Sequence, residues 1–119
     1  MTEIPKGWGR ELIFANEQTS GWYCGKLLIF NPHGRCSMHF HLRKKETWYI
    51  QSGTFTLRKI NPVDAALTIS SLLPGDVITN NPGEPHQLLA GPQGGTIFEA
   101  SSPDYPEDSY RVAKGDSQN

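Results

Sequence analysis

Two histidines and a glutamate lie close together in the stretch 34–53, and their side chains are of the types that bind metal ions. One residue separates His39 from His41, and Glu46 follows five positions later. Successive side chains of a β-strand point to opposite faces, so both imidazoles project to the same side of a strand at 36–42. Two neutral imidazoles and a carboxylate suit zinc, iron, manganese, nickel or cobalt. The spacing therefore predicts part of a divalent-metal site.

Two further histidines need different interpretations. His86 begins a short apolar stretch at the end of the segment 74–88, after a Pro-Gly turn. His33 lies in an Asn-Pro-His-Gly turn, where we expect an exposed ring that binds no metal. Histidines on strands are often surface or core residues with satisfied hydrogen bonds, so a lone His-x-His pair is weak evidence. The case for a metal site depends on the neighbouring motif residues.

These stretches resemble the two sequence motifs of the cupin superfamily. The first cupin motif has a glycine, a His-x-His pair, a glutamate after three or four residues and a glycine after six more. Four residues separate the first glycine from His39, where the pattern has five, and Asn81 stands where a proline is usual. Both departures affect turns. The matching residues are Gly34, His39, His41, Glu46 and Gly53 in the first motif, and Asp76, Gly83 and His86 in the second.

The resemblance implies a ligand set. In cupins the two histidines, the glutamate and the late histidine bind one divalent metal ion inside a small β-barrel. His39, His41, Glu46 and His86 occupy those positions in this sequence. The resemblance therefore implies one divalent metal cofactor, either Zn, Mn, Fe, Ni or Co.

Short segments of strand character recur along the chain, and helical periodicity is absent. Glycine, proline and asparagine divide the segments, a pattern typical of an all-β sandwich or barrel. The cupin resemblance narrows this class to a jelly-roll β-barrel, also called a double-stranded β-helix. We expect strands at 11–15, 22–30, 36–42, 46–51, 54–60, 67–72, 76–79, 86–89 and 96–100.

The chain of 119 residues fits one domain, which we place at 1–112, followed by a flexible C-terminal tail at 113–119. A formal charge of −1 and scattered basic residues argue against a nucleic-acid partner. No segment approaches the roughly 20 apolar residues of a membrane helix. A small-molecule substrate, with no nucleic acid and no membrane, is therefore the expected partner.

Cysteine use and the aromatic residues suggest location and assembly. Cys24 and Cys36 form no Cys-x-x-Cys pair, and the first residues lack an apolar leader, so we expect a cytoplasmic protein. Exposed strands of small jelly rolls often pair between chains, which favours a homodimer. We expect these residues in a core or an interface: Trp8, Trp22, Phe30, Phe55, Leu57, Ile78 and Phe98.

The flanking residues resemble the C-terminal cupin domain of type II mannose-6-phosphate isomerases over most of 7–112. That family closes with an acidic strand residue and a Gly-Glu-Asp-Asp-Ile-x-Arg segment, which 97–100 and 106–111 resemble. Pro106 replaces the glycine of that segment, and the nucleotidyltransferase domain of bifunctional members is missing. The other matches are Trp8-Gly9, Lys26, Ser37 and Glu46-x-Trp48.

This second resemblance implies an aldose–ketose isomerase for a sugar or sugar phosphate. The substrate carbonyl and its neighbouring hydroxyl would bind the metal, and Glu99 would move the proton between adjacent carbons. Arg111 would bind a phosphate, or pair with Glu107 or Asp108 instead. Lys26 would be a second phosphate or hydroxyl contact.

Other residues and activities stay open. Glu99 could equally be a solvent-facing strand residue, and Lys44 and Lys45 are expected in a solvated turn. Gln87 and Tyr49 are weaker candidates for contacts near the metal. The same ligands also suit an iron-dependent dioxygenase, or a non-catalytic cupin that binds a sugar or another small ligand.

Overall fold

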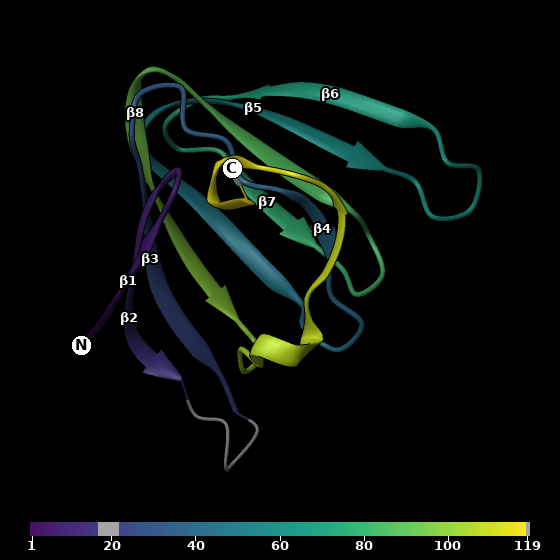
Figure 1. Cartoon of the computed structure of the whole chain (residues 1–119), viewed down its shortest axis with the longest axis horizontal. Coiled ribbons are helices and arrows are strands. Elements are labelled where there is room, and N and C mark those ends of the chain that lie inside the picture. Colours follow the sequence, from purple (N-terminus) through teal and green to yellow (C-terminus); the bar gives the residue numbers. More distant parts are fainter. Residues whose placement is uncertain (17–21, 119) are drawn as a thin grey trace.

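The computed structural model describes residues 1–16 and 22–118, and within them the chain forms strands and two short 3-10 helices, with no α-helix (Figure 1). None of the described helices has the length or apolar character needed to cross a membrane. The strands are β1 (Thr2–Lys6), β2 (Gly9–Asn16), β3 (Cys24–Phe30), β4 (Met38–Phe40), β5 (Glu46–Ile60), β6 (Leu67–Leu72), β7 (Val77–Asn80), β8 (His86–Ser101) and β9 (Tyr110–Ala113), and the 3-10 helices are η1 (Pro106–Asp108) and η2 (Asp116–Gln118).

Two long antiparallel strands, β5 and β8, take part in both faces of the barrel. The first part of β8 pairs with the second part of β5 and with β4, whereas the second part of β8 pairs with the first part of β5 and with β3. Strands β1, β2 and β7 widen one face, and β6 and β9 widen the other. The sheet curls around its interior, as Figure 1 shows. The jelly-roll β-barrel predicted from the sequence is confirmed.

Glycines allow β5 and β8 to bend together where they pass between the two faces. Gly53 and Gly94 have φ angles of 78° and 67°, a backbone region that residues with a Cβ rarely adopt. A Cβ on Gly53 would also lie 2.0 Å from the carbonyl oxygen of Gly94. The predicted breaks at Gly53 and after Leu89 are therefore bends within single strands, because hydrogen bonding resumes beyond each glycine.

The N-terminal hairpin was only partly predicted. β1 was missed, because Thr2–Lys6 has a proline and no regular apolar alternation, and it pairs with β2. Trp8 follows β1 and is buried, as expected. Trp22 and Phe98 are exposed and belong to no core, because their side chains lie on the outer side of the sheet or beyond its end.

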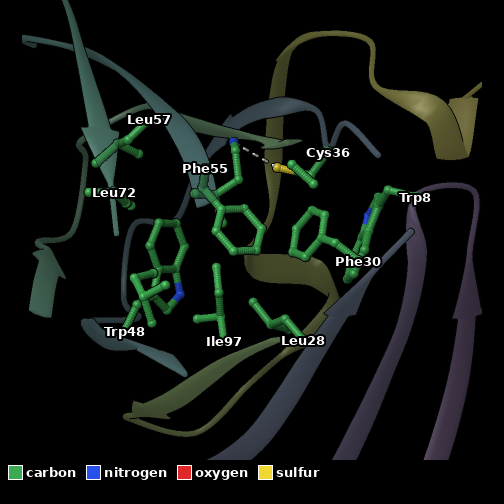
Figure 2. Packing of buried hydrophobic residues seen from close by; sticks show 12 residues of the cluster. Trp8, Leu28, Phe30, Cys36, Trp48, Phe55, Leu57, Leu72 and Ile97 are labelled. Carbon is green, nitrogen blue, oxygen red and sulfur yellow. Dashed lines mark hydrogen bonds between the residues drawn. The ribbon is translucent and has the colours of Figure 1, made fainter. Parts of the chain in front are cut away.

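The core fills the space between the two faces (Figure 2). Trp8 stacks on Phe30 with ring centroids 4.3 Å apart, and Phe30 meets Phe55 edge-on at 5.2 Å. Burying an aromatic side chain of about 150–250 Å² stabilises the fold by roughly 2–3 kcal/mol. The cluster contains Trp8, Leu28, Phe30, Cys36, Trp48, Ile50, Phe55, Leu57, Leu72, Leu88, Ala90 and Ile97, with Ile78 packed against it.

Both cysteines are free thiols inside the barrel. The Sγ atom of Cys36 accepts a hydrogen bond from the backbone N–H of Leu88 at 3.2 Å, the dashed line in Figure 2. Burial raises the pKa of Cys36 to about 12 and also raises the pKa of Cys24. Both thiols therefore stay protonated and serve as packing residues.

The C-terminal residues contact two segments from the first third of the chain. Asp116 accepts a hydrogen bond from the backbone N–H of Arg35, and the hydroxyl of Ser117 accepts one from Gly7. The expected flexible tail at 113–119 thus includes the last residue of β9 and the helix η2, and Asn119 lies outside the described residues. The flexibility of this segment stays a prediction.

Candidate metal centre

Three histidines from different parts of the chain meet inside the barrel. His39 lies in β4, His41 follows that strand directly, and His86 begins β8. His39 and His86 are partners in the antiparallel pairing of β4 with β8, which brings two of the rings together. One nitrogen from each ring lies within 4.8 Å of the others. This spacing allows all three rings to bind one ion.

Main-chain carbonyls orient the three rings. The Nδ1 atoms of His39, His41 and His86 lie 2.9, 2.7 and 2.9 Å from backbone oxygens. A carbonyl only accepts hydrogen bonds, so each Nδ1 carries a proton, and in a neutral ring Nε2 then has the lone pair that can bind a metal ion. Metal-binding histidines typically have such a partner on the second ring nitrogen. The accepting carbonyls belong to Ser37, Asp108 and Glu84.

Glu46, the first residue of β5, places a carboxylate beside these nitrogens. Its Oε1 atom lies 2.9 Å from Nε2 of His86 and 4.0 Å from Nε2 of His41. His86 Nε2 is buried, and among the described residues it has no hydrogen-bond partner besides this close contact with the Glu46 carboxylate. An unpartnered buried nitrogen beside a carboxylate fits a cation between them.

The protonation states also suit a cation. Burial, and then the neighbouring His86 ring, lower the pKa of His39 to about 3, and burial lowers the pKa of His41 as well. Burial opposes the charge of Glu46, but His86 and Lys44 outweigh it and hold the pKa of this carboxyl well below its usual range. Neutral imidazoles and an ionised carboxylate are the forms that bind metal.

A second carboxylate, Glu99, lies next to this cluster on β8. Its side chain is 2% exposed, so the alternative of a solvent-facing residue is wrong. The indole N–H of Trp48 donates to Oε1 at 3.1 Å, and the hydroxyl of Ser101 donates to Oε2 at 3.3 Å. Burial and the nearby Glu46 carboxylate raise the pKa of Glu99 to about 7, against the effect of two lysines.

Lys44 connects the two carboxylates, and the expectation that it lies in a solvated turn is wrong. It is 3% exposed, with Nζ 2.8 Å from Oε2 of Glu99 and 3.6 Å from Oε2 of Glu46. The carboxylates outweigh the cost of burial and raise the pKa of this amine well above its usual value. Lys45 is exposed, as expected. Lys44 therefore joins the metal cluster to Glu99.

Lys26 faces inward from β3 and is held by acidic groups. Its Nζ atom lies 3.3 Å from Glu11 and from Asp104, and 3.8 Å from Glu99. Lys26 thus has the inward orientation that the predicted substrate contact requires. Its ammonium group already contacts three carboxylates, so it has little capacity left for a substrate phosphate.

Arg111 lies on β9 directly opposite His39 in the pairing of β9 with β4. Among the described residues it makes no ion pair, because Glu107 binds Arg43 at 3.1 Å and the carboxylate of Asp108 faces the backbone. The alternative pairing of Arg111 with Glu107 or Asp108 is therefore not found. Its side chain lines the cavity described next.

Most of these groups, though not His86, line one cavity of about 390 Å³. Its size falls in the range of small-molecule sites, about 300–1,000 Å³. Tyr49 and Gln87 do not line it: Tyr49 is exposed, and Gln87 is buried and lines a different cavity. The polar lining residues are Lys6, Glu11, Lys26, Ser37, His39, His41, Lys44, Glu46, Glu99, Asp104, Tyr105, Ser109, Arg111, Ser117 and Gln118.

The arm at 104–111 covers this cavity and is fixed by Asp108. Its buried carboxylate accepts hydrogen bonds from the backbone N–H groups of Leu42, Arg43 and Lys44 at 2.9 to 3.2 Å. The backbone oxygen of the same residue accepts the Nδ1 proton of His41. One residue of the arm therefore fixes both the turn before β5 and a ring of the metal cluster.

Asp108→Ala is expected to lower the free energy of unfolding by about 2–4 kcal/mol, because it leaves several N–H groups of the turn without an acceptor. Urea unfolding of the metal-free protein measures this change. Glu107→Gln is the control on the same arm, since Glu107 is exposed, and it should change stability by less than about 0.5 kcal/mol. Equal stability of the two variants would contradict the assigned role of Asp108.

The fold and the histidine cluster together define the class. The chain is a β-barrel of the cupin type whose interior contains a site for a divalent metal ion. No protein-family model matches the sequence, and no curated protein matches it.

Solved structures of oxalate decarboxylase from Bacillus subtilis share this fold. A variant with phenylalanine in place of a tryptophan superposes with a TM-score of 0.82 at 15% sequence identity, covering 93% of this chain and 30% of that one. A structure of the enzyme determined at pH 4.6 superposes with a TM-score of 0.78 at 16% identity and the same coverage. The chain thus spans under a third of the length of these neighbours, and at this identity the likeness shows the fold alone.

Proposed function

We propose that the protein is a metal-dependent enzyme that transfers a proton on a small oxygen-rich substrate, as an aldose–ketose isomerase of a sugar or sugar phosphate. The observation that carries the proposal is the position of Glu99. This buried carboxylate lines the same cavity as His39, His41 and Glu46, and Lys44 joins it to Glu46. Resemblance of the flanking sequence to type II mannose-6-phosphate isomerases supports the same substrate class.

The proposed ligands are His39, His41, His86 and Glu46, and a bound divalent ion supplies a Lewis acid that polarises a carbonyl. The chain would supply the proton transfer. Glu99 accepts a proton from one substrate carbon and returns it to the adjacent carbon. The indole of Trp48 and the hydroxyl of Ser101 hold its two oxygens, so the carboxylate keeps one orientation.

Two basic residues have separate roles in this proposal. Arg111 makes no ion pair among the described residues and lines the cavity, so its planar guanidinium group can bind a phosphate through two hydrogen bonds. Lys26 is a positioning residue, because its contacts with Glu11, Asp104 and Glu99 hold the acidic side of the cavity in place.

The activity test uses metal-loaded protein with a panel of free and phosphorylated hexoses and pentoses. We expect aldose–ketose interconversion followed by proton NMR, with solvent deuterium entering the product because Glu99 exchanges its proton. A chelator should abolish the conversion and added divalent metal should restore it. Tight sugar binding without turnover would contradict the enzyme and support a binding protein. No binding and no turnover would exclude the whole substrate class.

A second candidate is an enzyme for small carboxylic acids. Arg111, which has no ion pair among the described residues, favours it because arginine also binds carboxylates. The neighbours of similar fold are named for the decarboxylation of oxalate. Carbon dioxide released from oxalate by the metal-loaded protein would support this candidate. Oxygen uptake with a carboxylic acid would favour the iron-dependent dioxygenase instead. Sugar conversion without either signal would exclude both.

A further inference from the structure

A second cavity of about 340 Å³ lies behind the wall formed by β4 and β9. This wall separates the second cavity from the metal centre, because neighbouring side chains of a strand point to opposite faces. His39 and Arg111 line the first cavity, and the adjacent Met38 and Val112 line the second. The strands β5 and β6 form its other side. Its lining residues are Arg35, Met38, Arg58, Ile60, Ala65, Leu67, Gln87, Val112, Ala113 and Lys114.

The charge in this second cavity is entirely positive. Arg35, Arg58 and Lys114 line it, and no carboxylate does. Asp116 lies 3.9 Å from Nε of Arg35 and compensates part of that charge. Arg58 and Lys114 have no acidic partner among the described residues. The cavity therefore has an excess of positive charge that an anion can neutralise.

Arg58 is the best placed of these cations. It is half-buried on β5, and its Nη1 atom donates to Oε1 of Gln87 at 3.0 Å. The amide nitrogen of Gln87 donates in turn to the backbone oxygen of Cys36 at 3.0 Å, which fixes the amide. Gln87 thus orients the guanidinium group and leaves its other N–H groups for a ligand.

The remaining walls are apolar. Met38 is buried at the base, and Ile60 lies beside it on the same face of β5 as Arg58. Leu67 and Val112 are 46% and 54% exposed, so their side chains have apolar surface free to contact a ligand. A charged group at one end and hydrocarbon around it match an amphiphilic ligand.

We infer that this second cavity binds a small monocarboxylate with an apolar body, its carboxylate paired with Arg58 and its hydrocarbon against Leu67 and Val112. Arginine presents two parallel N–H groups to a carboxylate, and Lys114 adds a second positive charge at the rim. This binding site needs neither the metal nor the proposed reaction.

Hexanoate is the probe, and acetate and hexan-1-ol are its matched controls, one without the hydrocarbon and one without the charge. The titration follows backbone amide signals of metal-free protein by NMR, so that hexanoate cannot bind through a metal ion. We expect saturable shifts at residues 67, 112 and 113, and binding of each control at least about tenfold weaker, because both the ion pair and the apolar contact are needed.

Two variants locate the carboxylate. Arg58→Gln should weaken hexanoate binding about tenfold or more, and Lys114→Gln, at an exposed position that cannot unfold the barrel, should weaken it by a smaller factor. Lys59→Gln is the control, because it removes one positive charge from the next residue of β5, whose side chain points to the other face. The inference fails if shifts are confined to the metal centre, if Lys59→Gln weakens binding as much as Arg58→Gln, or if no saturable shifts occur.

Discussion

His39→Ala is expected to weaken the binding of a divalent metal ion by more than about 100-fold while the barrel stays folded. The loss should exceed the 10- to 100-fold that follows from removing an outer partner of a ligand, because the variant removes a ligand atom itself. The ring belongs to no part of the hydrophobic core, so the metal-free variant should unfold at nearly the same urea concentration as the metal-free wild type. Metal titration and elemental analysis measure the binding.

His33→Asn is the matched control for this experiment. His33 is exposed in a turn with a φ angle of 59°, a conformation that asparagine tolerates better than alanine. This variant should keep full metal occupancy. A His39→Ala protein with unchanged metal affinity would show that the ring binds no ion, and an unfolded His39→Ala protein would indicate a structural role instead.

Glu99→Gln is expected to lower the rate of sugar isomerisation about 10²- to 10⁴-fold, the usual contribution of a positioned general base. The amide keeps nearly the same shape and can still contact Trp48, but it cannot accept the substrate proton. Metal occupancy should stay close to that of the wild type, because the three imidazoles and Glu46 are untouched. Turnover and metal content are measured on the same preparation.

The control for the Glu99 variant is Glu107→Gln, which makes the same chemical change on an exposed residue outside the set of proposed catalytic groups. Its rate should match the wild type. Glu99→Gln also removes one partner of Lys44, so urea unfolding must show that the variant is folded. A folded Glu99→Gln protein with wild-type turnover would remove Glu99 from the reaction.

The metal cluster could be predicted from the sequence by a local rule together with a family resemblance. Strand alternation alone sets the shared direction of His39 and His41, whereas the full ligand set with Glu46 and His86 followed from the resemblance to the cupin motifs. Lys44 lies two residues before Glu46, outside any strand, and its side chain is nevertheless buried. Lys44 was expected in solvent because its burial depends on carboxylates that are remote in the sequence. Its partner Glu99 lies 55 positions further along the chain.

Other features depended on contacts that no local pattern reveals. The pairing of β1 with β2 gives order to a segment without a strand pattern. The bends at Gly53 and Gly94 interrupt the apolar alternation without ending the strands, so sequence rules divided each long strand in two. The role of Asp108 was not predicted for the same reason, since its partners lie more than 60 residues away.

The two bonding roles of Asp108 imply that release of a bound cation and opening of the arm at 104–111 are thermodynamically coupled. Its carbonyl holds the His41 ring in the orientation that binds the ion, and its carboxylate binds the backbone N–H of Leu42, directly after His41. An ion that favours this orientation of His41 must favour the closed position of the arm by the same free energy, because such coupling is reciprocal. Metal-free protein would therefore expose its interior more often than metal-bound protein does, so an ion would enter through the side that the arm covers.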